Sequence, residues 1–194
     1  MHTGSLETDN AAADFVESVK ATGRALIRKN HPLVLLVGAL ALAVGGALSL
    51  GILFGPLALG YARVCLRIAR DEAVDLRDLG SGFDRFGASL FAALLLAIAM
   101  AIGSLVVVGG VVVGFFATFT FYAMAEHDDW GAVDSVKRSI VLVKRNLLDV
   151  ALFWVLSLIV VGILGYAVVG GPVAIALATL LGAFLYRRIS EQMT

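Results

Sequence analysis

The sequence predicts an all-α integral membrane protein in which six transmembrane helices form three parallel helical hairpins. Each hairpin is preceded by an amphipathic helix at the membrane surface. Hydrophobic residues make up 60% of the 194 residues, and the mean hydropathy is +0.94. Charged residues make up only 15%, whereas a soluble domain carries roughly a quarter. Long apolar stretches also alternate with short basic segments. These observations exclude a soluble enzyme, a nucleic-acid-binding protein and a disordered chain.

Charge and cysteine content narrow the class further. The chain carries 15 basic and 15 acidic residues, so no net field attracts a polyanion or a polycation. The single cysteine, Cys65, leaves no disulfide framework and no cysteine-based metal site. We therefore expect neither a metal nor another cofactor.

The predicted helices are read from the apolar stretches and their breaks. The stretches cover residues 33–54, 89–108, 111–125, 147–169 and 173–186. A helix needs about 20 residues to cross the hydrocarbon core. Breaks rich in glycine and proline occur at Gly55-Pro56, Gly109-Gly110 and Gly170-Gly171-Pro172. Because glycine and proline end helices and permit tight turns, each break predicts the apex of a hairpin.

The positions of the charges predict the orientation. All 15 lysines and arginines lie in the segments that precede or follow the hairpins, or on the second helix of a hairpin as it returns to that side. The three apices carry no charge. The positive-inside rule places both termini in the cytoplasm of a multi-pass protein of the cytoplasmic (inner) membrane. The N-terminus does not read as a secretory signal peptide, because its apolar run begins only at Leu33. Residues 1–13 are small and polar, which predicts a flexible tail.

A threefold internal repeat is predicted within one membrane domain, 14–194, with units at about 14–72, 73–129 and 130–190. Each unit opens with apolar residues at steps of three, four and three, which form one stripe of a helix. The stripes are Val16, Val19, Gly23 and Leu26; Leu76, Leu79, Phe83 and Phe86; and Val133, Val136, Ile140 and Val143. Two crossings per unit make the units parallel, related by a pseudo-threefold axis along the membrane normal. The alternative is that amphipathic helices produce such stripes by chance.

Three arginines are the strongest candidate for a binding site. Arg63, Arg67 and Arg70 share one face of a helix, and Arg63 lies only eight residues after Gly55. A guanidinium within the membrane usually faces a partner or water, and it binds phosphate well. One hypothesis is a site for a lipid phosphate or another anion, with no carboxylate at comparable depth. The alternative is that these side chains snorkel to the interface.

Further basic residues are expected at the membrane surface, on the polar faces of the amphipathic helices, where they meet anionic lipid. They are Lys20, Arg24, Arg28, Lys137 and Lys144. The acidic run 126–129 is the only segment that resembles a divalent-cation site, but we favour Asp128 or Asp129 as a cap for the following helix. Trp130 beside them suits a headgroup-level anchor.

Small residues predict close helix packing where they recur four positions apart. These residues are Gly51, Gly55, Gly110, Gly114, Ala178 and Gly182. The spacing is common within helix bundles, and it also supports contacts between subunits.

No catalytic group is visible. Gly80-Ser81-Gly82 superficially resembles a nucleotide loop, but no strand precedes it and no Lys-Ser/Thr follows it. His2, His31 and His127 have no candidate nucleophile beside them. We therefore expect a protein that is not an enzyme.

From residue 55 onward the layout resembles a broad prokaryotic family of six-helix membrane proteins. That family includes the membrane domain fused to some glycerophosphodiester phosphodiesterases and several families of unknown function. The resemblance is carried by Gly55-Pro56-Leu57, Gly60-Tyr61, Gly82-Phe83 with Phe86, the Gly109-Gly110 apex and the segment 132–146. It implies the fold and the membrane location. It does not extend to the phosphodiesterase domain, so no activity is carried over.

Two functions are carried forward from the sequence. The first is a non-enzymatic scaffold, assembly partner or membrane-organising module that self-associates or binds another membrane protein, with lipids, including anionic ones, as partners. It is motivated by the absence of catalytic residues and by three basic amphipathic helices on one side. The alternative is a transporter or channel for an anion or small molecule that uses Arg63 and Arg67. Nucleic acid is not an expected partner.

Overall fold

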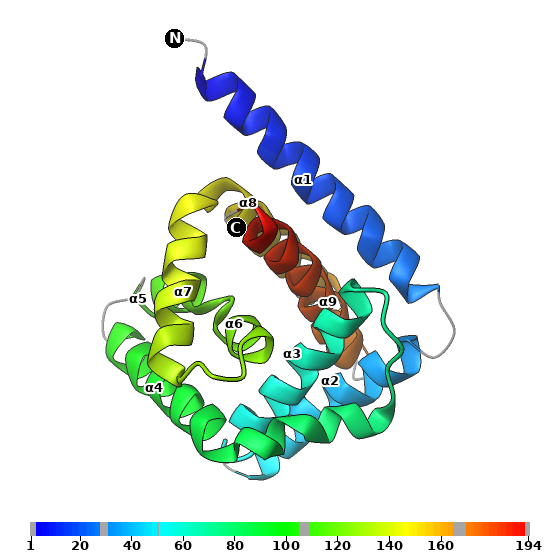
Figure 1. The fold of residues 1–194 in the computed structure, drawn as a ribbon, viewed down its shortest axis with the longest axis vertical. Coiled ribbons are helices and arrows are strands. Elements are labelled where there is room, and N and C mark those ends of the chain that lie inside the picture. Colours follow the sequence, from blue (N-terminus) through cyan, green and yellow to red (C-terminus); the bar gives the residue numbers. More distant parts are fainter. Residues whose placement is uncertain (1–2, 28–30, 50, 105–108, 165–169, 193–194) are drawn as a thin grey trace.

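The computed structural model describes residues 3–27, 31–49, 51–104, 109–164 and 170–192, with side chains from Phe15 onward. Over these ranges the chain is all-α and contains no sheet (Figure 1). The helices are α1 Thr3–Leu26, α2 His31–Leu48, α3 Phe54–Ala69, the 3-10 helix η1 Leu76–Arg85, α4 Phe86–Ser104, α5 Gly109–Ala117, α6 Thr120–Glu126, α7 Ala132–Arg145, α8 Leu147–Leu164 and α9 Gly170–Glu191.

Five segments are long and apolar enough to cross a membrane, which makes this a multi-pass membrane protein. They are His31–Leu48, Leu76–Ser104, Gly109–Glu126, Leu147–Leu164 and Gly171–Glu191. The helix pairs expected to form hairpins are in contact: α2 with α3, α4 with α5, and α8 with α9.

The sixth expected span, α3, differs from the prediction. It has only 16 residues, and 12 of them are buried. It packs against α2, η1, α4, α6 and α9, so it lies at the centre of the molecule and not at its edge. The reason is composition: Arg63, Arg67 and the small residues around them suit a helix surrounded by protein more than one that faces lipid.

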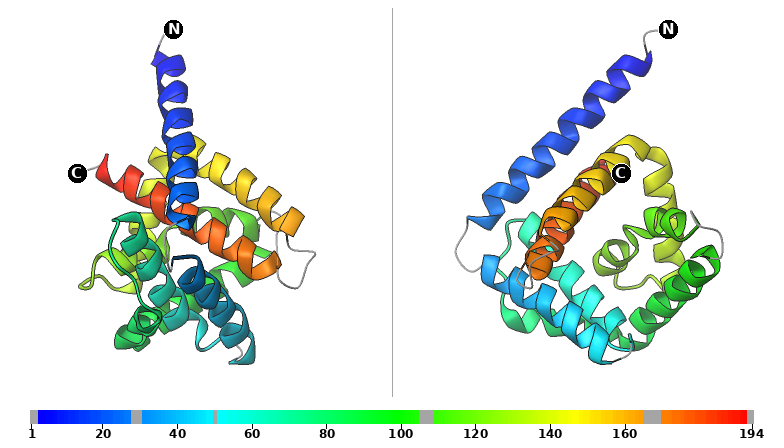
Figure 2. Two further views of the ribbon diagram at one scale, coloured as in Figure 1. Left: turned by 90° about the vertical axis from the view of Figure 1, so that its right-hand side faces the viewer. Right: turned by 180° about the vertical axis from the view of Figure 1, so that it is seen from behind.

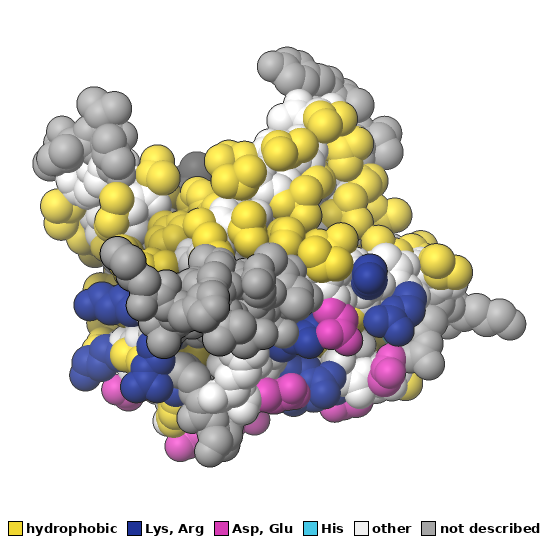
Figure 3. Space-filling model, turned by 90° about the horizontal axis from the view of Figure 1, so that it is seen from above, with side chains coloured by type: hydrophobic (Ala, Val, Ile, Leu, Met, Phe, Trp, Pro, Cys, Tyr) yellow, Lys and Arg dark blue, Asp and Glu magenta, His cyan; other side chains and the backbone are white. Residues whose placement is uncertain are grey.

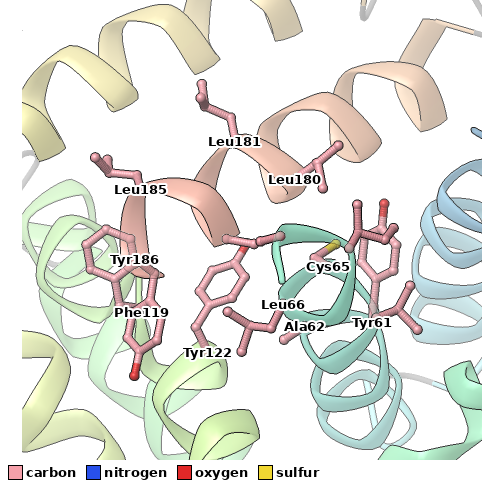
Figure 4. Close-up of a cluster of buried hydrophobic side chains, with 14 of the residues drawn as sticks. Tyr61, Ala62, Cys65, Leu66, Phe119, Tyr122, Leu180, Leu181, Leu185 and Tyr186 are labelled. Carbon is pink, nitrogen blue, oxygen red and sulfur yellow. The ribbon is translucent and has the colours of Figure 1, made fainter. Parts of the chain in front are cut away.

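The core is built around one face of α3, α6 and α9. Figure 4 shows Tyr61 and Cys65 of α3 beside Tyr122 of α6 and Leu180 and Tyr186 of α9. Of these five side chains, Tyr122 is 7% exposed and the other four at most 1%. The rings of Tyr122 and Tyr186 stack with their centroids 5.8 Å apart. Bulky side chains therefore fill the space between the three helices.

Polar and apolar side chains separate to opposite ends of the molecule. Figure 3 shows hydrophobic side chains over the upper part and a band of charged ones along the lower part. Helix α1 runs across the direction of α8 and α9 at this charged end, and it packs against both of them (Figure 2, left).

The segments expected as amphipathic α-helices show two differences. Residues 3–13, expected as a flexible tail, belong to helix α1 in the structure. Ala11, Ala12 and Ala13 are strong helix formers, which favours this extension. The second segment is the 3-10 helix η1 and not an α-helix. Gly80 and Gly82 lower its helix propensity, and the Asp75 N–H donates to Asp78 Oδ2 at 2.8 Å at its start. The third segment forms α7 as expected.

Candidate functional site

Arg63 and Arg67 lie in the carboxy-terminal half of α3, and Arg70 is the C-cap of this helix. Arg63 is the most enclosed of the three. Its side chain is only 17% exposed. Nη1 donates to the Ser81 carbonyl of η1 at 2.7 Å, and Nη2 donates to Asp128 Oδ1 at 2.5 Å. The sequence predicted no carboxylate at a depth comparable to that of Arg63, but in the structure Asp128 contacts it. Asp128 follows Arg63 by 65 residues in the chain, and the loop after α6 returns it to α3.

The other two arginines of this face are also paired. Arg67 contacts Glu72 Oε2 at 3.2 Å and Asp78 Oδ1 at 2.9 Å. Arg70 contacts Glu126 Oε1 at 2.9 Å. The structure thus joins the three predicted arginines into an ion-pair cluster with carboxylates from η1, α6 and the loops beside them. The predicted lipid or anion contact of Arg63, Arg67 and Arg70 stays a prediction, and these carboxylates compete with it.

Arg85 is a member of this cluster that sequence reasoning missed. It donates to the carbonyls of Met124 and His127 at 3.1 Å each and to the carbonyl of Trp130. The His127 and Trp130 rings stack at 3.8 Å between centroids. One guanidinium therefore holds the whole loop between α6 and α7. Nothing in the local sequence pairs position 85 with this loop.

The acidic run 126–129 does not cap α7. The N-cap of that helix is Gly131, which makes no side-chain cap hydrogen bond. Asp128 is used by Arg63 instead, and Glu126 accepts from Arg70 and, through Oε2, from the Tyr186 hydroxyl at 2.7 Å. Among the described residues no group of three His, Cys, Asp or Glu side chains is placed to hold a metal ion.

Beneath the cluster, η1 lies against α3 at backbone distance. A Cβ on Gly82 would overlap the Pro56 carbonyl oxygen and come within 2.5 Å of the Gly60 nitrogen. A Cβ on Gly60 would overlap the Leu79 carbonyl oxygen. Two glycines facing each other therefore allow Arg63 and Arg67 to reach η1. Both glycines belong to the pattern that carries the family resemblance.

The third candidate span, Gly109–Glu126, is broken between α5 and α6. Side chains from α7 and α8 supply hydrogen-bond partners at the break. The Ser139 hydroxyl donates to the Phe116 carbonyl at 2.7 Å and accepts from the Phe119 N–H at 3.1 Å. Trp154 Nε1 donates to the Thr118 hydroxyl at 2.9 Å. Irregular backbone at membrane depth requires such partners, because lipid supplies none.

Four of the five cations predicted at the membrane surface lie within the described residues, and all four are exposed. Lys20, Arg24, Lys137 and Lys144 are exposed, and Arg28 lies outside the described residues. Lys137 is 4.0 Å from Asp134. On α1, Glu17 is paired with Arg188 of α9 at 2.6 Å. The Arg188 guanidinium, by hydrogen bonding, holds the pKa of the Glu17 carboxyl below its ordinary value.

The predicted packing residues mostly make contacts within the chain. A Cβ on Gly55 would overlap the Ser89 carbonyl oxygen, and one on Gly110 would lie 2.7 Å from Ser104 Oγ. At Gly114 a Cβ would meet Trp154 at 3.3 Å, and at Gly182 it would meet the Tyr122 hydroxyl at 2.9 Å.

Gly51 and Ala178 differ from these four. A Cβ on Gly51 would meet nothing within 4 Å, and the φ of 87° at this residue shows that glycine is needed for the turn and not for packing. Ala178 lines a groove between α1, α8 and α9.

Comparison with known proteins adds no assignment. No family model matches the chain, and neither the curated proteins nor the solved structures contain a match. The resemblance to six-helix membrane proteins therefore stays a prediction.

Proposed function

We propose that this protein is a non-enzymatic membrane module that organises the cytoplasmic leaflet and serves as a scaffold or assembly partner. One observation carries the proposal: amphipathic segments at the charged end expose apolar side chains. Val16 and Val19 of α1 are 49% and 37% exposed, Phe83 of η1 is 41% exposed, and Val133 of α7 is 46% exposed. In water such a set of apolar side chains is costly, but at the headgroup level it inserts into the bilayer.

The opposite faces of these helices support the same reading. Helix α1 turns Ser18 and Thr22 toward the protein, and α7 turns Ser135 and Ser139 toward it; all four are at most 6% exposed. Three of these hydroxyls donate to backbone carbonyls: Thr22 to Ser18 at 2.8 Å, Ser135 to Gly131 at 2.9 Å and Ser139 to Phe116 at 2.7 Å. Small hydroxyl residues allow close docking on the protein, which leaves the larger apolar side chains free to face lipid.

The alternative, an anion transporter or channel using Arg63 and Arg67, has less support. Both guanidiniums are held by carboxylates at 2.5 to 3.2 Å. The tyrosine-rich core of α3, α6 and α9 also fills the centre of the molecule. An anion would have to displace the carboxylates and move the core to pass.

The proposed orientation places the charged band, both termini and the interfacial segments in the cytoplasm. Single cysteines introduced at Asp84 and Lys137, after replacing the buried Cys65, should react with an impermeant reagent only from the cytoplasmic side. A cysteine at Val111, which is 57% exposed near the middle apex, should react only from the other side. Reaction of Val111 from the cytoplasm would contradict the orientation.

Membrane organisation is tested on reconstituted protein. We expect the wild type to self-associate in nanodiscs, measured by mass photometry and cross-linking, and to favour small, highly curved vesicles. Val16→Gln combined with Val19→Gln removes the apolar edge of α1 and should abolish the curvature preference. Val16→Leu with Val19→Leu keeps that edge and is the matched control. A monomer that conducts an anion in liposomes would overturn the proposal in favour of the transporter.

A further inference from the structure

A groove of about 300 Å³ lies under the apolar flank of α1, where that helix crosses α8 and α9. It is lined by Val19, Thr22, Gly23 and Leu26 of α1, Leu156, Ser157 and Val160 of α8, and Leu177, Ala178 and Leu181 of α9. We propose that this groove holds one acyl chain of an anionic phospholipid whose phosphate lies against Lys20 and Arg24. The site is distinct from the predicted arginine cluster on α3.

The arrangement of α1 matches the two ends of such a lipid. At 100° per residue, Thr22 faces the protein, Val19 and Gly23 follow on one flank, and Lys20 and Arg24 lie on the far side. Thr22 is 6% exposed, whereas Lys20 and Arg24 are exposed. A molecule that runs over this flank therefore meets two cations first and the apolar groove next.

Charge complementarity selects an anionic headgroup. Arg63, Arg67 and Arg70 are each paired with a carboxylate, but Lys20 and Arg24 form no ion pair within the described part of the chain. The carboxylate of Glu17 on the same helix is bound by Arg188 at 2.6 Å. Lys20 and Arg24 also attract this carboxylate, since they help to lower its pKa, but neither is within ion-pair distance of it among the described contacts. An exposed ammonium and an exposed guanidinium beside an apolar groove suit a lipid headgroup with a net negative charge better than a zwitterionic or neutral one.

A buried hydroxyl in the groove gives a second, independent indication of a ligand. Ser157 lines it, and the Ser157 Oγ is buried without a hydrogen-bond partner among the described residues. A buried hydroxyl normally has a partner. The Ser157 hydroxyl could donate a hydrogen bond to the ester carbonyl of a lipid, whereas the hydrocarbon part of an acyl chain has no acceptor.

Gly23 provides a sharp test of the groove. Nothing lies within 4 Å of a Cβ at this position, so substitution causes no clash, and both alanine and leucine favour the helix over glycine. Gly23→Leu fills the groove, whereas Gly23→Ala is the matched control that improves the helix and leaves the groove open. Native mass spectrometry of protein extracted from bilayers of equal phosphatidylglycerol and phosphatidylcholine should show one retained phosphatidylglycerol in the wild type and in Gly23→Ala, and its loss in Gly23→Leu.

The headgroup contact is tested by charge. Lys20→Gln with Arg24→Gln should lower the preference for phosphatidylglycerol over phosphatidylcholine at least about fivefold, the effect of a single charge near an anionic surface. Lys137→Gln with Lys144→Gln removes the same charge from α7 and should leave the retained lipid unchanged. Equal losses from both double variants would overturn the site, because they would show only general attraction.

The lipid site rests on the proposed function, because it requires α1 to lie at the cytoplasmic leaflet. The remaining outcomes distinguish failure of the lipid site from failure of the proposed function. Retention of phosphatidylglycerol by Gly23→Leu at the wild-type level would refute the site while leaving the curvature result intact. Loss of self-association in Gly23→Leu without loss of lipid would assign the groove to a second copy of the chain and would also refute it. Failure of the orientation labelling would remove the proposed function itself.

Discussion

Substituting Gly82 by alanine should be the most destabilising single-methyl change in the charged half of the molecule. The added Cβ would overlap the Pro56 carbonyl oxygen and lie 2.5 Å from the Gly60 nitrogen, and both are backbone atoms of the central helix α3. A flexible side chain could move aside, but here η1 must lift off α3. Overpacking of a tight contact costs about 1–3 kcal/mol, and separating two backbones falls at the upper end, so we expect about 3 kcal/mol.

Gly80 provides the control within the same 3-10 helix. A Cβ at Gly80 meets nothing within 4 Å, and neither glycine has a positive φ, so the two substitutions differ only in the space available. Gly80→Ala should change stability by no more than about 0.5 kcal/mol. Reversible unfolding in mixed micelles with increasing SDS, followed by tryptophan fluorescence, measures both free energies. Equal stability of the two variants would refute the reasoning that the glycine contact positions η1.

Three further predictions concern the polar contacts. Ser139→Ala leaves two backbone groups unsatisfied at the break before α6, at about 1–3 kcal/mol each, so we expect a loss of about 2–6 kcal/mol in SDS unfolding. Ser135→Ala, which loses one bond to a carbonyl four residues earlier, should cost much less. Because Arg188 lowers the pKa of Glu17, their ion pair stabilises the docking of α1 above pH 4.5. This stabilisation is lost as the pH falls through the pKa that Glu17 has in the folded protein, so protease cleavage of α1 should increase there. Glu17→Gln should abolish this pH dependence. Arg63→Gln should destabilise the protein by about 1–3 kcal/mol. It should not change the retention of phosphatidylglycerol, because the partners of Arg63 are Asp128 and the Ser81 carbonyl. Selective loss of phosphatidylglycerol in this variant would instead support the phosphate site predicted from the sequence.

The helices were predictable because they depend on local composition. The apolar stretches and the glycine breaks indicated the helix pairs, and the stripe of α7 indicated that helix. The clustering of charge at one end followed from the same reading. Where local propensity was weak, the prediction differed: η1 contains two glycines, and one of them, Gly82, lies against the backbone of α3. The position of α3 at the centre also depends on packing, which periodicity does not report.

The partners of the arginine cluster could not be predicted, because they are brought together only by the fold. Asp128 is 65 residues from Arg63, and Trp130 is 45 residues from Arg85. A sequence spacing of four or seven shows which residues share a helix face, but not what faces them. Glycine is typical of positions where two backbones approach closely, but only the fold shows that Gly60 and Gly82 face each other.

The ion pair between Arg63 and Asp128 also constrains the order in which the chain is assembled. Helix α3 emerges from the ribosome before η1 and well before the loop that carries Asp128. Until Asp128 has been made, the Arg63 side chain, only 17% exposed in the folded protein, has no carboxylate partner, and an enclosed charge without a partner is costly. The first hairpin therefore cannot reach its final environment until the segment through Asp128 has been synthesised. Biogenesis of this protein should be cooperative across its first two units, and a nascent chain arrested before residue 128 should leave α3 accessible to the insertion machinery.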